Sequence, residues 1–165
     1  MVAGKLTLGL ILVATVACTP RDDDELATTT AADTAAGTAA DMAHEWVAAP
    51  GLPAGAEMAV ISGNPGEPGP FTVHLRFPND YRVPPHTHPA AETVTVVSGL
   101  LHAGRGRTLD MAAPGVSELR PGQSIELPGN DPHWAHAAGE TVIEVRSTGP
   151  FRLDYVNPAD APPAP

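Results

Sequence analysis

Residues 86–92 of the chain read HTHPAAE, and this stretch indicates the fold more specifically than any other. Residues two apart in a β-strand project from the same face, so the side chains of His86 and His88 are expected to point the same way. Glu92 follows a short turn and begins a Val-rich strand in which Glu92, Val94 and Val96 share a face. Two imidazoles and one carboxylate are therefore expected to converge from neighbouring strands.

A second segment, residues 122–133, reads GQSIELPGNDPH and supplies a further imidazole. His133 follows a turn rich in Pro and Gly and starts another strand. Three His and one Glu form a ligand set suited to Fe, Mn, Co, Ni, Cu or Zn. We therefore predict one divalent transition metal ion of open identity, bound by His86, His88, Glu92 and His133. The alternative is that these are ordinary surface groups. A lone His-x-His pair would favour that alternative, but four candidate ligands at these spacings in two separate segments outweigh it.

Both segments resemble the motifs of the cupin superfamily, and in particular its quercetin-dioxygenase-like group. The first cupin motif has two His one residue apart, a Glu four residues after the second His, and a Gly seven residues further on. Those positions hold His86, His88, Glu92 and Gly99. The second motif has a Gly, a Pro six residues later and a His five residues after the Pro, and here these are Gly122, Pro128 and His133. The resemblance covers the whole globular region and implies a single jelly-roll barrel with the metal inside, bound by those four ligands.

Three positions depart from the two motifs. Asp80 stands where the first motif has Gly, Asn130 replaces a Gly inside the second, and Ala137 replaces its closing Asn. Asn tolerates left-handed backbone nearly as Gly does, so a turn at Asn130 is still expected. Because none of the three is a ligand, they affect loop shape and pocket chemistry rather than metal binding.

The region from residue 45 to residue 158 as a whole predicts an all-β domain. Apolar and polar residues alternate from Phe71 to Phe77, from Val142 to Val145 and from Phe151 to Tyr155, with the period of two that strands require. Turn signals with Gly and Pro recur at intervals of roughly ten residues, a spacing typical of sandwiches and barrels. No internal repeat is visible, which favours one barrel rather than two.

Other polar residues receive weaker assignments. His136 lies three residues beyond His133 and is expected to face the other way, whereas His102 could face either side of its strand. Glu126 and Asp131 are candidates to accept hydrogen bonds from the ligand His rings, since metal sites usually need such supporting acceptors.

Charge excludes one class of partner. The net charge is −10, with nine Lys plus Arg against nineteen Asp plus Glu. Nucleic-acid binding draws its affinity from basic side chains that neutralise phosphates, and this chain has no basic run. An anionic membrane surface would repel so acidic a protein, so a membrane is expected to be a partner only through a covalent lipid anchor.

The N-terminal residues predict export. Residues 1–18 have one positive charge at Lys5, a short apolar stretch and a single cysteine, Cys18, in the sequence ATVAC, which resembles a lipoprotein processing site. Residues 19–44 are rich in Ala, Thr and Asp and predict a disordered linker, and residues 159–165 form a Pro/Ala tail. We expect a lipid-anchored envelope protein in the periplasm or outer membrane. Plain secretion and a retained anchor are the alternatives.

Two functions remain open at this stage. The first is a metal-dependent, oxygenase-like enzyme acting on a small organic molecule, in which Glu92 ligates the ion or serves as the catalytic base. The second is a non-catalytic module that binds or senses a metal or a ligand, because cupins host many functions. The expected partner is a small-molecule ligand or substrate, and a homodimer stays open.

Overall fold

The structure, a computed structural model, describes residues 45–163. The predicted signal segment, its Cys18 and the linker at residues 19–44 lie outside the described residues. Within the described residues, no helix has both the length and the apolar character that crossing a membrane requires.

The described residues form β-strands and one short 3-10 helix, so the all-β prediction is confirmed. The strands are β1 (Val47–Ala48), β2 (Glu57–Ser62), β3 (Gly69–Phe77), β4 (Arg82–Thr87), β5 (Glu92–Ser98), β6 (Leu101–Arg105), β7 (Ser117–Leu119), β8 (Ser124–Leu127), β9 (His133–Ala137), β10 (Thr141–Gly149) and β11 (Asp154–Tyr155). The helix, η1, is Pro158–Asp160.

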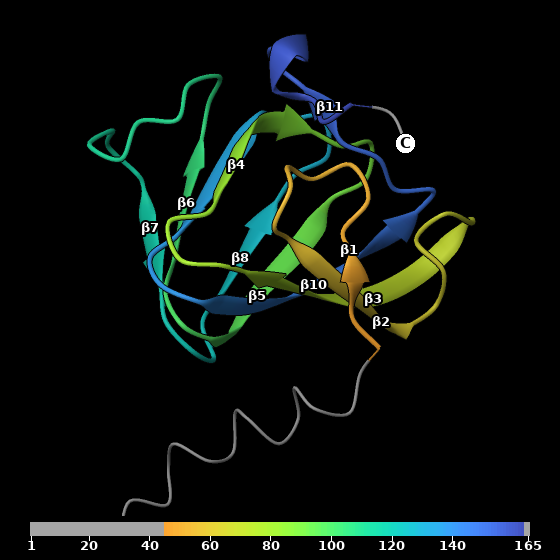
Figure 1. Ribbon diagram of the computed structural model, residues 1–165. Helices are drawn as coiled ribbons and strands as arrows, with labels where there is room; N and C mark the ends of the chain where they lie inside the picture. Colours follow the sequence, from red (N-terminus) through yellow and green to blue (C-terminus); the bar gives the residue numbers. More distant parts are fainter. Residues whose placement is uncertain (1–44, 164–165) are drawn as a thin grey trace, which may run out of the picture. The chain divides into compact units, whose positions relative to one another are not determined.

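The strands form two antiparallel sheets, which Figure 1 shows closing around a common interior. One sheet has the order β1-β2-β3-β10-β5-β8 and the other the order β11-β4-β9-β6-β7. The buried core takes residues from both sheets, such as Val73 and Val94 from the first and Val83 and Leu101 from the second. This arrangement is the predicted jelly-roll barrel.

The alternation seen in the sequence decides which side chains fill the barrel. In β5, Glu92, Val94 and Val96 are all buried while the residues between them are partly exposed. Phe71 and Phe77 of β3 are likewise buried, at 3% and 1% exposure. Complete burial of one Val or Phe side chain stabilises a fold by roughly 1.5–3 kcal/mol, so these inward rows hold the sheets together.

Residues 151–155 do not follow the strand prediction completely. Only Asp154 and Tyr155 pair with β4. The backbone N–H of Phe151 instead donates to the carbonyl of Pro65, 2.7 Å away, in a connection between two loops. The predicted strand is therefore wrong for Phe151 to Leu153, although both of these side chains pack against the core.

Two of the departures from the cupin motifs lie in left-handed backbone. Asp80 and Asn130 both have a φ of 59°, the conformation that Gly adopts most easily. The turn expected at Asn130 is confirmed. Short polar side chains are the ones that best tolerate this region apart from Gly, which is why the barrel keeps its loop shape without a Gly at either place.

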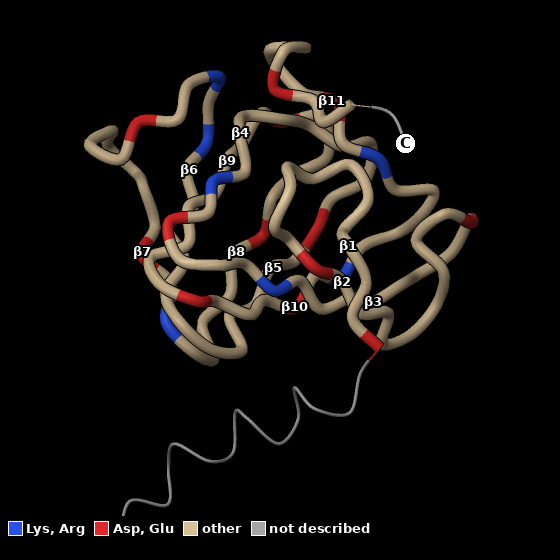
Figure 2. The backbone as a smooth tube through the Cα atoms, in the orientation of Figure 1, with Lys and Arg blue, Asp and Glu red and all other residues tan. Residues whose placement is uncertain are grey.

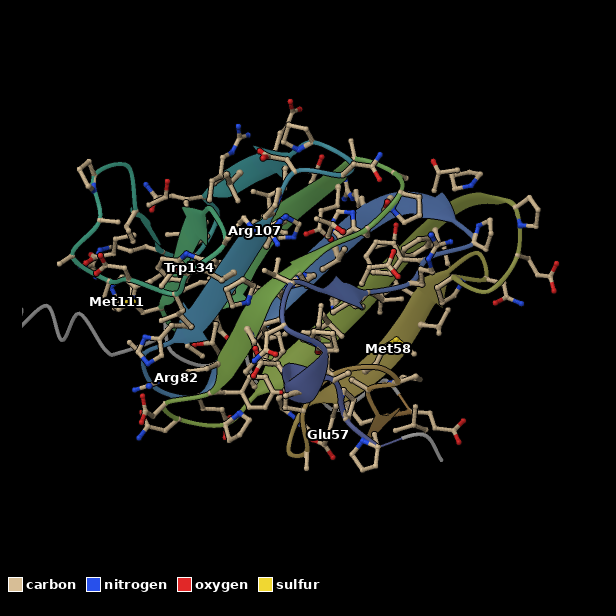
Figure 3. All side chains as sticks on the ribbon, turned by 90° about the horizontal axis from the view of Figure 1, so that it is seen from above. Glu57, Met58, Arg82, Arg107, Met111 and Trp134 are labelled. Atoms are coloured by element: carbon tan, nitrogen blue, oxygen red, sulfur yellow. The ribbon has the colours of Figure 1, made fainter. Side chains whose placement is uncertain are left out.

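One close approach in the second sheet depends on a Gly. Gly104 of β6 lies opposite Trp134 of β9. A Cβ atom added to Gly104 would overlap the indole ring of Trp134, which is 1% exposed. Figure 3 labels Trp134 in the same part of the view as Arg107 and Met111, which belong to the loop between β6 and β7. Trp134 is therefore a packing residue.

Candidate metal centre

The four predicted ligands lie in or directly next to three strands, two from one sheet and one from the other. His86 lies in β4 and His133 starts β9, and the two residues face each other in the ladder between these strands. His88 directly follows the end of β4, and Glu92 begins β5 in the other sheet. All four are buried, with exposures of 6% for His86, 0% for His88, 8% for Glu92 and 3% for His133.

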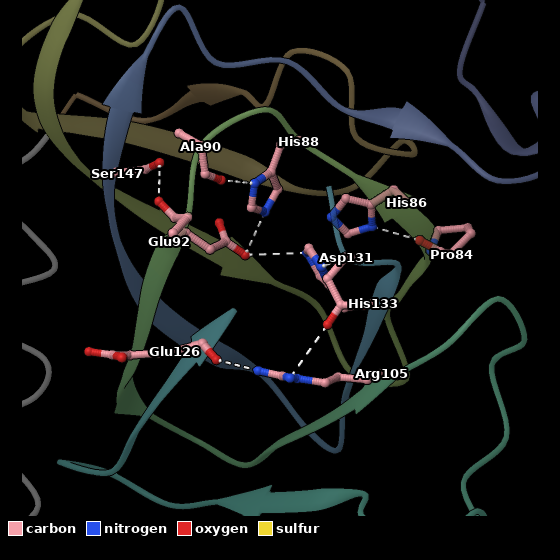
Figure 4. Close-up of polar contacts among 11 residues, drawn as sticks. Pro84, His86, His88, Ala90, Glu92, Arg105, Glu126, Asp131, His133 and Ser147 are labelled. Carbon is pink, nitrogen blue, oxygen red and sulfur yellow. Dashed lines mark hydrogen bonds and ion pairs between the residues drawn. The ribbon is translucent and has the colours of Figure 1, made fainter. Parts of the chain in front are cut away.

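The folded barrel brings the four side chains together, as Figure 4 shows. One ring nitrogen from each of His86, His88 and His133 lies within 4.8 Å of the others. The Oε1 atom of Glu92 lies 3.1 Å from Nε2 of His88 and 3.4 Å from Nε2 of His133. Within the described part of the chain, Glu92 is the sole buried acidic or basic residue apart from His. Metal binding itself stays a prediction.

Backbone carbonyls orient all three rings. Each Nδ1 atom contacts a carbonyl oxygen two residues away, and because a carbonyl can only accept, each Nδ1 carries the proton. The acceptors are the carbonyls of Pro84 for His86 (2.8 Å), Ala90 for His88 (2.6 Å) and Asp131 for His133 (2.8 Å). In the neutral form of each ring the lone pair is then on Nε2, which makes Nε2 the ligand atom.

The supporting role assigned to the carboxylates of Glu126 and Asp131 is wrong. The backbone carbonyl of Asp131, and not its side chain, accepts from His133. The Asp131 carboxylate lies 3.5 Å from Arg105, which also donates to the backbone carbonyl of Glu126. Local carbonyls can hold the rings because each ligand sits next to a strand end, where the chain turns back on itself.

The geometry of the site fits a metal ion. Nε2 of His88 and Nε2 of His133 are fully buried and make no aligned hydrogen bond. Buried polar atoms without a partner are rare in folded proteins, and each needs an explanation. Two imidazole lone pairs that converge beside a carboxylate oxygen are what a divalent transition metal requires, and N and O atoms are ligands such ions accept.

Protonation states of the metal-free site follow from burial and contact. Burial, helped by the neighbouring His133, lowers the pKa of His86 to about 4. Burial raises the pKa of the Glu92 carboxyl, but contacts with His133 and His88 outweigh it and lower that pKa to about 2. Burial lowers the pKa of His88, and the contact with Glu92 more than reverses this, so the pKa is raised. At neutral pH His86 is therefore neutral and Glu92 ionised, the forms that bind a metal.

A cavity of about 100 Å³ opens beside the cluster, inside the barrel. His86, Glu92 and His133 supply its polar end. Aromatic and aliphatic side chains line the remainder, among them Val94, as expected, and Phe151. Sequence reasoning missed Phe151 as a site residue, and the apolar alternation around it was the one available signal.

The remaining polar residues considered from the sequence lie away from the cavity. His136 contacts Asp80 at 2.7 Å, and Asp80 also pairs with Arg82 at 3.4 Å. His102 stacks on His136, with ring centroids 5.8 Å apart, and lies 3.6 Å from Glu118. The expectation that His136 faces away from His133 is confirmed, and His102 proves to share the face of His136.

The described residues thus form a jelly-roll barrel with three His and one Glu converging inside it. No family model and no curated protein matches the chain. Solved structures do match. KdgF from Halomonas sp. is 20% identical, with a TM-score of 0.51, over 64% of this chain and 87% of that one. An RmlC-like cupin from Shewanella frigidimarina is 18% identical, with a TM-score of 0.51, over 66% and 87% of the two chains.

A third similar structure is the polyketide cyclase RemF from Streptomyces resistomycificus. It is 18% identical, with a TM-score of 0.52, over 72% of this chain and 85% of that one. These likenesses show that the chain has the cupin fold.

Proposed function

We propose that this protein is a metal-dependent, oxygenase-like cupin enzyme that acts on a small organic molecule. The observation that carries the proposal is that His86, Glu92 and His133 line one part of an otherwise apolar cavity. A site that only held a metal for stability would not need such a cavity next to its ligands. Pockets of this composition are the usual surroundings of a bound organic molecule.

The residues of the chain have distinct roles in this proposal. His86, His88 and His133 hold the ion through Nε2, and their Nδ1 bonds to backbone carbonyls keep the rings from turning. When bound, the ion would polarise substrate oxygen atoms and make a bound hydroxyl more acidic. The apolar walls exclude water, which strengthens electrostatic interactions at the polar end.

Glu92 serves better as a ligand than as a base. A general base works best when its pKa lies near the working pH. The contacts with His133 and His88 lower the pKa of Glu92 to about 2, so its carboxylate is a weak base in the metal-free site. A carboxylate that is always ionised suits metal binding. The catalytic role of Glu92 stays a prediction.

The alternative function is a module that binds or senses metal without turnover. The observation that favours it is the compactness of the four-ligand group, because three Nε2 atoms and one carboxylate oxygen are enough to close a tetrahedral zinc site. The fold does not decide between the two, since RemF is a cyclase while other functions occur on the same fold.

Oxygen uptake tests the enzyme proposal. Protein reconstituted separately with Fe, Mn, Ni and Cu would be given catechols, enediols and flavonols, with free metal as the blank. We expect uptake with at least one pair, loss of uptake in His133→Ala, and retention in His136→Ala, whose side chain lies outside the cavity. Zinc in the protein purified from its native host, together with no uptake in any combination, would favour the binding module.

We also propose that the protein works outside the cytoplasm, anchored by a lipid on Cys18. The support is the sequence of residues 1–18 and the acidic linker at residues 19–44, which would let the barrel at residues 45–158 reach away from a membrane. The small-molecule partner proposed above would then be an envelope or extracellular compound.

A further inference from the structure

We infer that the cavity takes a ligand with one metal-binding head and an uncharged hydrocarbon body about the size of a single ring. This inference rests on the proposed function for the head of the ligand and on the cavity walls for its body. It narrows the substrate class to molecules whose body, beyond the metal-binding head, carries no charge.

The polar atoms of the cavity are concentrated at one end. His86, Glu92 and His133 are the ionisable residues among those that line it. The other lining residues are Ala, Val, Leu, Ile, Met, Pro, Phe and Trp, so apart from the indole of Trp134 the walls offer no side-chain hydroxyl, amide or cation. Figure 2 shows the Lys and Arg residues of the described barrel spread over several strands and loops, and none of them lines the cavity.

Such apolar walls strongly disfavour the binding of a ligand whose body carries a charge. A carboxylate that loses its water shell needs an ion pair or hydrogen bonds in return, and these walls provide neither. A ligand with a carboxylate on its body should therefore bind at least about 100-fold more weakly than its uncharged counterpart.

The volume limits the length of the body. An engineered apolar cavity of roughly 150 Å³ binds benzene. The cavity described here measures about 100 Å³. The enclosed part of the ligand therefore corresponds to one ring at most or to a short branched chain, and a three-ring flavonol is too large to be enclosed.

Phe151 sets this limit at one wall. Its ring packs edge-on against Phe71, with centroids 5.3 Å apart, and lies 4.8 Å from the ring of the ligand His88. Phe151 belongs to the connection between β10 and β11, outside any strand, and is partly exposed. Replacing Phe151 with Ala would therefore lengthen the cavity without removing a hydrogen bond between two strands of the barrel.

The test compares ligands that differ in one group. Equilibrium binding to metal-free protein would be measured by NMR for toluene and benzoate. Zinc-loaded protein, which has no redox chemistry, would be titrated with 4-methylcatechol, 3,4-dihydroxybenzoate and 3-hydroxyflavone. We expect toluene and 4-methylcatechol to bind, and both carboxylates to bind at least about 100-fold more weakly. We also expect 3-hydroxyflavone to bind to Phe151→Ala more tightly than to the wild type.

Equal binding of either matched pair would overturn the inference, and so would tight binding of 3-hydroxyflavone to the wild type. Metal content and oxygen uptake would be measured on the same samples. Selective binding of the uncharged ligands without oxygen uptake would refute the proposed enzyme and leave the inference about the cavity standing. The toluene and benzoate pair needs no metal, so a failure of metal binding would not obscure the result.

Discussion

Replacement of Glu92 by Gln should remove a large, pH-dependent part of the stability of the metal-free protein. Gln keeps the shape of the side chain and removes its charge. The contacts with His133 and His88 lower the pKa of Glu92 from 4.5 to about 2. At 1.36 kcal/mol per pH unit, this difference corresponds to about 3 kcal/mol in the free energy of unfolding.

The sign of this effect is fixed by the direction of the pKa change. A carboxyl whose pKa is lower in the folded than in the unfolded protein stabilises the fold above its ordinary pKa, here 4.5. That contribution is lost as the pH falls from 4.5 towards 2. The wild type should therefore lose stability relative to Glu92→Gln over this range. The difference between the two should be constant from pH 4.5 to 6.5, above which His88, whose pKa the contact with Glu92 raises, also begins to lose its proton.

Urea unfolding of chelator-treated protein, followed by tryptophan fluorescence at pH values from 2 to 7, would measure this difference. Glu140→Gln removes an exposed carboxylate and serves as the matched control. If the difference between wild type and Glu92→Gln does not change with pH, or changes no more than in the control, the ionised Glu92 is not held by the His rings as described.

Three further outcomes are expected. Purified protein should carry close to one equivalent of transition metal by elemental analysis. His133→Ala should lose most of this metal and His136→Ala should keep it. Equal metal retention in both variants would contradict the assignment of His133 as a ligand. Gly104→Ala should lower the free energy of unfolding by roughly 1–3 kcal/mol in a denaturation experiment, since its Cβ would overlap Trp134, and wild-type stability would show that the ring can move. A palmitate analogue should label the wild type in a bacterial host and not Cys18→Ser, and unlabelled wild type in the soluble periplasm would refute the anchor but not export.

The convergence of His86, His88, Glu92 and His133 is the part of the structure that the sequence predicts best. The spacing from His86 to Glu92 places the ligands at strand ends. The strand period of two then predicts which face of its strand each side chain occupies, without any knowledge of how the sheets pack. The same reasoning assigns the inward row of β5 correctly. These predictions succeed because each depends on residues that are close in the sequence.

The cavity could not be predicted in the same way. Its walls combine β3, β5 and the connection that carries Phe151, and how these pack across the barrel is not encoded in any local period. Alternation predicts a strand at Phe151, yet its backbone N–H pairs with Pro65 in another loop. The acceptors for the His rings were also missed, because the reasoning looked for carboxylates where backbone carbonyls two residues away were already in reach.

The position of the cluster links metal binding to folding. His86 and His133 belong to one sheet and Glu92 to the other, so the four ligands meet only when the barrel has closed. An unfolded chain has no such site, and the binding free energy of an ion therefore adds to the stability of the folded state. In the metal-free protein, contacts of Glu92 with His88 and His133 provide part of the same connection between the sheets, at 3.1 and 3.4 Å. When Nε2 of His88 is protonated, the Glu92 carboxylate thus holds the two sheets together in the metal-free barrel, at the point where the ion would join them.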